Sequence, residues 1–190
     1  MTTESRDYDF AHQQFIGADS VLLEMVEVSS KRARSLSTPK VLVLSMLAGA
    51  FIAVGALFSI YLGAGIETAG LKSLMEGFGF SVGFFLVILT GALLFTEVNV
   101  EVPATFMGLF RQHGGFAGLL PSLLRLWGLA AVGNLVGTFL IGAMINYAHD
   151  LPPLQAELLV EVAGTKLRYQ EVGGAEGFFQ AMVSGALGNW

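Results

Sequence analysis

The chain has 190 residues, of which 54% are hydrophobic and 13% are charged, whereas a typical soluble domain carries about 25% charged residues. A mean hydropathy of +0.66 with a net charge of −5 excludes a disordered protein, a coiled coil and a nucleic-acid-binding module. Cysteine is absent, which excludes a disulfide framework and thiolate metal sites. The composition is that of a membrane protein rather than an ordinary cytosolic domain.

Residues 1–40 form a polar N-terminal segment, with six acidic residues before any long apolar run and therefore no signal peptide. Asp19 can cap a helix that continues to about Leu36 and is ended by Pro39. One face of this helix is apolar, which suits a helix lying on a membrane surface. A helix that packs against a partner subunit is equally consistent with the pattern. The residues on that face are Leu22, Met25, Val26 and Ser29.

Residues 41–190 form a predicted transmembrane domain, because four runs in it lack any formal charge. A bilayer core about 30 Å thick needs about 20 helical residues. Three runs meet this length, which argues against a soluble protein with buried helices, and the fourth is cut off by the end of the chain. We therefore expect the N-terminal portion of a longer protein. The predicted spans are about 41–63, 77–102 and 122–147, with an outer loop at 149–176 and the start of a fourth span at 177–190.

The positive charges near the span ends predict the orientation in the plasma membrane. Six lysine and arginine residues lie on the side of the N-terminus and three on the other side, so the N-terminus is predicted to be cytoplasmic. The six are Lys31, Arg32, Arg34, Lys40, Arg111 and Arg125, and the three are Lys72, Lys166 and Arg168.

Small residues in the first and third spans are typical of close helix packing in lipid, where the hydrophobic effect does not drive association. Gly49 lies in the first span, and Gly133 and Gly137 form a GxxxG pattern in the third. Asn134 lies between those two glycines. A polar side chain at that depth is more often an interhelical hydrogen bond than a transport site.

The second span is predicted to be interrupted near residues 91–97. Gly79, Gly83 and Gly91 weaken a continuous helix, and a polar cluster that contains Thr96 and Glu97 follows. Irregular backbone at membrane depth is tolerated where it lines a cavity, and the exposed N-terminus of a half-helix can hold an anion. The simpler alternative is a helix that ends at Thr96, where a cytoplasmic loop begins.

These residues resemble the formate/nitrite transporter family over roughly residues 17–190. The resemblance rests on the order and spacing of five elements, of which the Leu-Phe-Thr sequence after a glycine-rich helix is the most specific. The elements are Ala48-Gly49-Ala50-Phe51-Ile52, Phe80-Ser81-x-Gly83-Phe84, Gly91-Ala92-x-Leu94-Phe95-Thr96, Arg125-Leu126-Trp127-x6-Gly133-Asn134-Leu135-Val136-Gly137 and Gly185-x-Leu187-x-Asn189-Trp190.

The resemblance implies an all-α membrane protein with an aquaporin-like bundle. Six spanning helices form an inverted repeat, and the second and fifth of them are broken. This chain would contain the bundle only as far as the start of its fourth span. It also implies a homopentamer with one pore per subunit. Formate, nitrite or hydrosulfide would pass as the neutral acid at the narrowest point, where a bare anion would cost many kcal/mol. The partners implied are the lipid bilayer and a small anion; no cofactor, metal or nucleic acid is implied.

Carried over residue by residue, the resemblance assigns several positions to the substrate pathway. Phe80 and Phe84 match positions that narrow the pore, and Leu94, Phe95 and Thr96 match the loop that interrupts the second helix. Leu94 would plug the cytoplasmic side, and Thr96 would offer hydrogen bonds to the anion. Asn189 matches a residue near the pore in the fourth helix.

The chain also departs from the family pattern. Many members carry an acidic residue where this chain has Leu93, and Gly-Asn where it has Glu97-Val98. An unpaired Glu97 at the pore mouth would repel anions, and this residue is typical of a branch of the family without an established substrate. The family's central histidine on the fifth helix has no match here. The three histidines of the chain lie outside the predicted spans: His12, His113 and His149.

No sequence motif of an enzyme is present, so catalysis is not expected. Two functions of different classes remain. The first is an oligomeric channel for small monovalent anions or their weak acids, active as the complete protein. The second is a non-conducting membrane assembly or interaction module, or a fragment that is inactive by itself.

Overall fold

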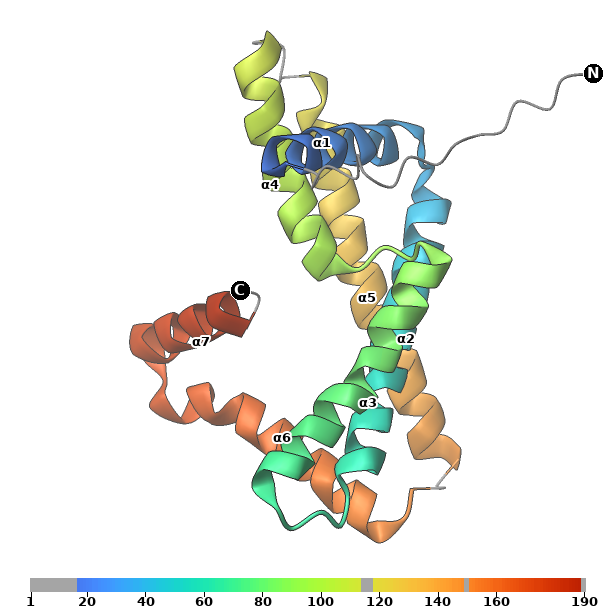
Figure 1. Ribbon diagram of the computed structural model, residues 1–190, viewed down its shortest axis with the longest axis vertical. Coiled ribbons are helices and arrows are strands. Elements are labelled where there is room, and N and C mark those ends of the chain that lie inside the picture. Colours follow the sequence, from blue (N-terminus) through green and yellow to red (C-terminus); the bar gives the residue numbers. More distant parts are fainter. Residues whose placement is uncertain (1–16, 114–117, 149–150, 189–190) are drawn as a thin grey trace, which may run out of the picture.

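The computed structural model describes residues 17–113, 118–148 and 151–188, and all regular structure within them is helical. This confirms the predicted all-α fold. The seven helices are α1 (Ala18–Ser35), α2 (Thr38–Gly63), α3 (Ala69–Thr90), α4 (Phe95–His113), α5 (Leu120–Ala148), α6 (Pro153–Val172) and α7 (Gly174–Gly188). Figure 1 shows α1 and α4 at the upper end and α6 near the lower end, with α2, α3 and α5 running between these ends and α7 off to the left.

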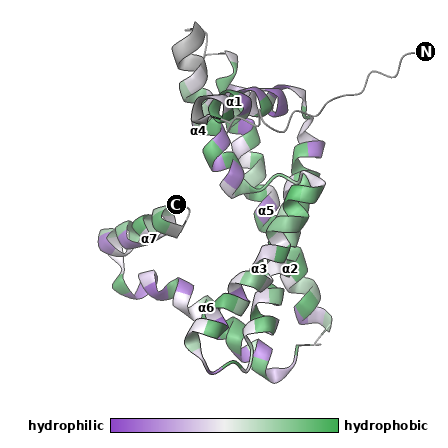
Figure 2. Cartoon of the chain, viewed as in Figure 1, coloured by the Kyte–Doolittle hydropathy of each residue, from purple (hydrophilic) through white to green (hydrophobic). Residues whose placement is uncertain are grey.

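Three of these helices, α2, α3 and α5, are long and apolar enough to cross a membrane. Figure 2 shows hydrophobic residues along all three, whereas α1 carries many hydrophilic ones. At most 28% of each apolar window is buried within the chain. The remaining apolar surface therefore needs lipid or other protein to cover it.

Glycines let α2 approach α3 and α5 closely. A Cβ atom on Gly79 would lie 2.6 Å from the carbonyl oxygen of Phe58, and one on Gly55 would lie 2.8 Å from that of Phe80. On the other side of α2, three glycines leave no room for a side chain. Gly49 contacts the Asn134 backbone, Gly133 contacts Ser45, and Gly137 contacts the Met46 backbone.

Helix α1 crosses α4 and one end of α5 and does not run parallel to the spanning helices (Figure 1). It ends at Ser35, two residues before Ser37, the extended residue that precedes α2. The prediction that Pro39 ends this helix was wrong, because α1 has already ended at Ser35. Pro39 lies in the first turn of α2, where its missing N–H group has no intrahelical partner to lose.

The connection between α5 and α7 also differs from the prediction. Most of the outer loop expected at 149–176 is helix α6, preceded by Pro152 and followed by Gly173 in a positive-φ conformation. The charged residues of this segment interrupt the uncharged runs, but lysine, arginine and glutamate are compatible with an exposed helix. Helix α7 packs on α6 and extends away from the three spanning helices (Figure 1).

Candidate substrate pathway at the interrupted helix

The second span is interrupted, as predicted, directly after Thr90. Gly91 adopts a left-handed conformation with φ of +62° and ψ of 28°, which glycine reaches without the steric cost that a Cβ atom imposes. The backbone nitrogen of Gly91 donates to Ile88 O at 3.3 Å, and that of Ala92 donates to Val87 O at 3.2 Å. These bonds close the last turn of α3 and direct the chain out of the helix.

Beyond the turn, the chain leaves the neighbourhood of α3 for that of other helices. The nitrogen of Leu93 donates to Leu44 O in α2 at 3.2 Å. Helix α4 then starts at Phe95 and packs on α1 and α5, whereas α3 packs on α2. The predicted loop is therefore shorter than expected: of the Leu-Phe-Thr element, only Leu94 lies in it, and Phe95 and Thr96 form the first turn of α4.

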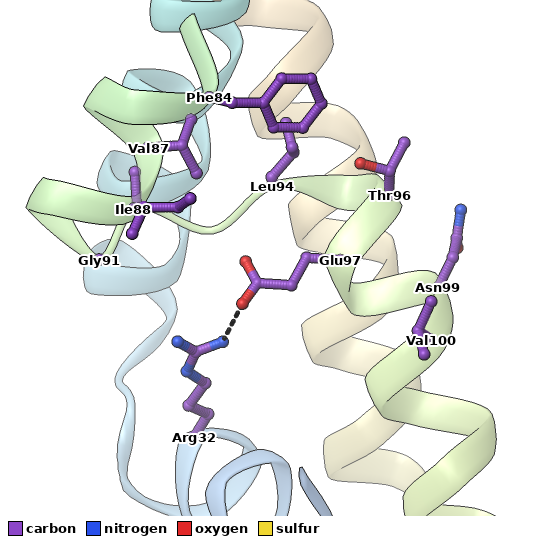
Figure 3. Close-up of a pocket in the computed structure, with 11 residues that line it drawn as sticks. Arg32, Phe84, Val87, Ile88, Gly91, Leu94, Thr96, Glu97, Asn99 and Val100 are labelled. Atoms are coloured by element: carbon purple, nitrogen blue, oxygen red, sulfur yellow. Dashed lines mark hydrogen bonds and ion pairs between the residues drawn. The ribbon is translucent and has the colours of Figure 1, made fainter. Parts of the chain in front are cut away.

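The space between the end of α3 and the start of α4 is a cavity of about 840 Å³. Figure 3 shows the side chains of Phe84 and Leu94 close together at one end of it, and Arg32 with Glu97 at the other. Its lining comes from α1, α3, the interruption and α4, and consists of Arg32, Phe84, Val87, Ile88, Gly91, Ala92, Leu94, Thr96, Glu97, Asn99 and Val100.

The structure brings three of the residues assigned from the family resemblance to this cavity: Phe84, Leu94 and Thr96. Phe80 is not in the lining, but its ring meets the ring of Phe84 edge-on, with centroids 5.5 Å apart. The ring of Phe95 stacks instead on Trp127 of α5 at 6.4 Å. Asn189, His12 and His149 lie outside the described residues, as does the side chain of His113.

Charged groups at the cavity are paired. Arg32 Nη1 lies 3.4 Å from Glu97 Oε1 and 2.6 Å from Glu101 Oε1. Helix α4, which carries both carboxylates, is outside the three helices apolar enough to span a membrane. Glu97 also lies in the first turn of α4, where a negative charge is favourable to the helix dipole.

Sequence reasoning did not foresee the place of Arg32 in this site, and it foresaw only part of the role of Asn134. Arg32 had counted only toward orientation, yet it lines the cavity. Asn134 was predicted to form an interhelical hydrogen bond; its side chain accepts one from Phe95 N at 3.0 Å and donates to Ser45 O at 3.0 Å and Leu93 O at 2.9 Å. Its place between Gly133 and Gly137, at a close helix contact, was the available signal.

The described residues thus form apolar helices long enough to span a membrane and an interruption that lines a cavity with polar and apolar side chains. These features are typical of multi-pass membrane channels and transporters. Residues 19–190 match the formate/nitrite transporter family. This chain belongs to that family.

Individual relatives are similar to the chain over most of its length. A probable formate transporter of Methanothermobacter thermautotrophicus is 36% identical over 67% of this chain and 46% of its own length. An uncharacterised transporter of Bacillus subtilis, YrhG, is 30% identical over 75% of this chain and 53% of its own length. A formate-nitrite transporter of Entamoeba histolytica is 29% identical over 80% of this chain and 40% of its own length.

The chain thus spans about half the length of the curated relatives that it matches. No solved structure matches it.

Proposed function

We propose that the complete protein is a membrane channel or transporter for small monovalent anions or their weak acids, of the formate, nitrite and hydrosulfide class. Family membership supports transport, and two of the three relatives above carry names that specify formate or formate and nitrite. The observation that carries the proposal is the cavity at the interruption, which joins Phe84 and Leu94 to Thr96 and the paired Arg32 and Glu97.

The two ends of this cavity suit the two forms of a weak acid. At the Arg32 end, a charged guanidinium favours an anion. At the other end, the apolar side chains of Phe84 and Leu94 offer nothing to replace water around a charge, so the neutral acid passes them at a lower cost. Thr96 lies beside Leu94 in the first turn of α4, where its hydroxyl group and the positive end of the helix dipole are available to the substrate. The proposed flux therefore increases as the pH falls toward the pKa of the substrate.

The contact of Glu97 with Arg32 weakens the objection that the charge of Glu97 would repel anions. Arg32 lies within 3.4 Å of that carboxylate and also lines the cavity.

We further propose that the complete protein lies in the plasma membrane with α1 on the cytoplasmic side, and that it assembles as a homopentamer. The large exposed apolar surface of α3, α5 and α7 supports such an assembly or a surrounding bilayer.

The test uses the complete protein in liposomes and a matched pair of variants on α3. Phe84 lines the cavity, whereas its neighbour Phe85 is more exposed and does not. We expect saturable or pH-dependent flux of formate, nitrite or hydrosulfide in the wild type. Phe84→Ala is expected to conduct faster or with less discrimination, and Phe85→Ala to conduct as the wild type does. Phe80→Ala is expected to have a weaker effect of the same kind, since Phe80 supports the Phe84 ring.

Absence of flux for all three substrates from correctly assembled wild-type protein would contradict the proposal and favour the non-conducting assembly module. Equal effects of Phe84→Ala and Phe85→Ala would place the pathway elsewhere, and an unchanged Phe80→Ala would leave that residue with a packing role alone.

A further inference from the structure

The backbone on both sides of Leu94 is held by one side chain from another helix. Asn134 of α5 donates from Nδ2 to the carbonyl oxygen of Leu93 at 2.9 Å and accepts at Oδ1 from the backbone nitrogen of Phe95 at 3.0 Å. Leu94 lies between these two contacts and is 7% exposed, with its side chain in the lining of the cavity. Its position relative to Phe84 thus depends on a residue that does not line the cavity itself.

The Asn134 amide has little freedom to adopt another arrangement. Its Nδ2 group has two hydrogens, and the second contact goes to Ser45 O in α2 at 3.0 Å. Both donors and the acceptor are therefore engaged, by α2 and by the interruption. The glycines at 133 and 137 bring α5 into close contact with α2 next to this side chain.

A second bond from α2 acts on the same segment. The nitrogen of Leu93 donates to Leu44 O at 3.2 Å, so Leu93 is held through both its N–H and its C=O groups. Free backbone groups in an irregular segment at membrane depth need such partners. Asn134 is the partner that also binds the first residue of α4, and it therefore ties the backbone on both sides of Leu94 to α5.

We infer that Asn134 is a positioning residue: it holds Leu94 against the route beside Phe84 and thereby limits the size of the anion that passes. The inference rests on the proposed function, and it adds a residue outside the cavity that determines selectivity. Asn134 neither touches the substrate nor supplies a proton.

The experiment compares Asn134→Ala, Asn134→Asp and Thr138→Val in the complete protein. Thr138 is the matched control because it lies one turn further along α5 and donates to Gly49 O in α2 at 3.2 Å, without a contact to the interruption. Asn134→Asp keeps the size and the acceptor for Phe95 N but loses both donors. If Asn134→Ala does not assemble, Asn134→Asp carries the test.

Two readouts are measured: amide hydrogen exchange of residues 91–98, and the ratio of lactate flux to formate flux in liposomes. We expect the Phe95 amide to exchange about tenfold faster in Asn134→Ala and to change little in Asn134→Asp. Both variants should raise the lactate-to-formate ratio about tenfold, because each releases the Leu93 carbonyl group. Thr138→Val should change neither readout.

A loss of flux that is equal for lactate and formate would show a purely structural role and overturn the inference. Unchanged exchange of residues 91–98 in Asn134→Ala would overturn it as well. If the wild type conducts neither anion, the proposed function fails, whereas the exchange data still decide whether Asn134 holds Leu94 in place.

Discussion

Arg32 of α1 and Glu101 of α4 form a close ion pair, with Nη1 and Oε1 separated by 2.6 Å. Glu101 is 5% exposed, and its other carboxylate oxygen has no hydrogen-bond partner among the described residues. The same guanidinium lies 3.4 Å from Glu97 at the cavity. One residue of the N-terminal helix therefore contacts two carboxylates next to the interruption.

Replacement of Arg32 should loosen α1 from α4. In Arg32→Ala, the buried Glu101 loses its charged partner, which costs about 1–3 kcal/mol. We expect faster amide hydrogen exchange in α1 and earlier proteolytic cleavage near Ser37, the extended residue between α1 and α2. Arg34→Ala is the control, since Arg34 is exposed on the same helix.

The double variant Arg32→Ala with Glu101→Gln separates charge from packing. A neutral amide is less costly to bury than a carboxylate, so the second change should restore most of the protection of α1. If the double variant exchanges as fast as Arg32→Ala alone, the pairing does not hold α1.

The left-handed conformation of Gly91 predicts a strict preference for glycine at the interruption. Ala at this φ of +62° costs about 1–2 kcal/mol, so Gly91→Ala should lower the thermal unfolding temperature of the protein in detergent. The same change at Gly128 of α5, where a Cβ atom meets nothing within 4 Å, should have no such cost and favours the helix. Equal unfolding temperatures for the two variants would contradict the described turn.

The approach of α5 to α2 predicts a different glycine effect, one of space rather than of conformation. A Cβ atom at Gly137 would overlap the carbonyl oxygen of Met46, so Gly137→Ala should force the helices apart at a cost of about 1–3 kcal/mol or more. Gly142→Ala, on the same helix but with open space around it, should be tolerated. Thermal unfolding of both variants measures the difference, and comparable stability would argue against close contact at Gly137.

Much of the fold followed from the sequence because charge and glycine positions reflect simple constraints. A run without charges predicts a spanning helix, and Gly91 before a polar cluster predicts the interruption. The start of α3 at Ala69 lies well before the predicted start at 77, since Lys72 and Glu76 end the uncharged run but not the helix; they are one turn apart and 3.9 Å from each other. Helix α6 was missed because charge alone does not distinguish a loop from an exposed helix.

The site was predictable only in part, for a physical reason. Phe84, Leu94 and Thr96 come together because neighbouring segments of one interrupted helix bring them there. Arg32 and Asn134 contact the same region although they are distant in the sequence. Arg32 lies 65 positions before its partner Glu97, and Asn134 lies 39 positions after its partner Phe95. Such contacts depend on how α1 and α5 cross α4, which no local pattern of residues specifies.

The most direct test of the account is whether water reaches Thr96 through a narrow route. The 190 residues contain no cysteine, so Thr96→Cys can be introduced without background into a complete protein that has no other cysteine. The matched position is Phe139 of α5, a 73% exposed residue on the apolar surface. In liposomes, a water-soluble anionic thiol reagent should modify Thr96→Cys and block anion flux, but leave Phe139→Cys unmodified. If Thr96→Cys is as unreactive as Phe139→Cys in a correctly assembled protein, the interruption does not face an aqueous pathway.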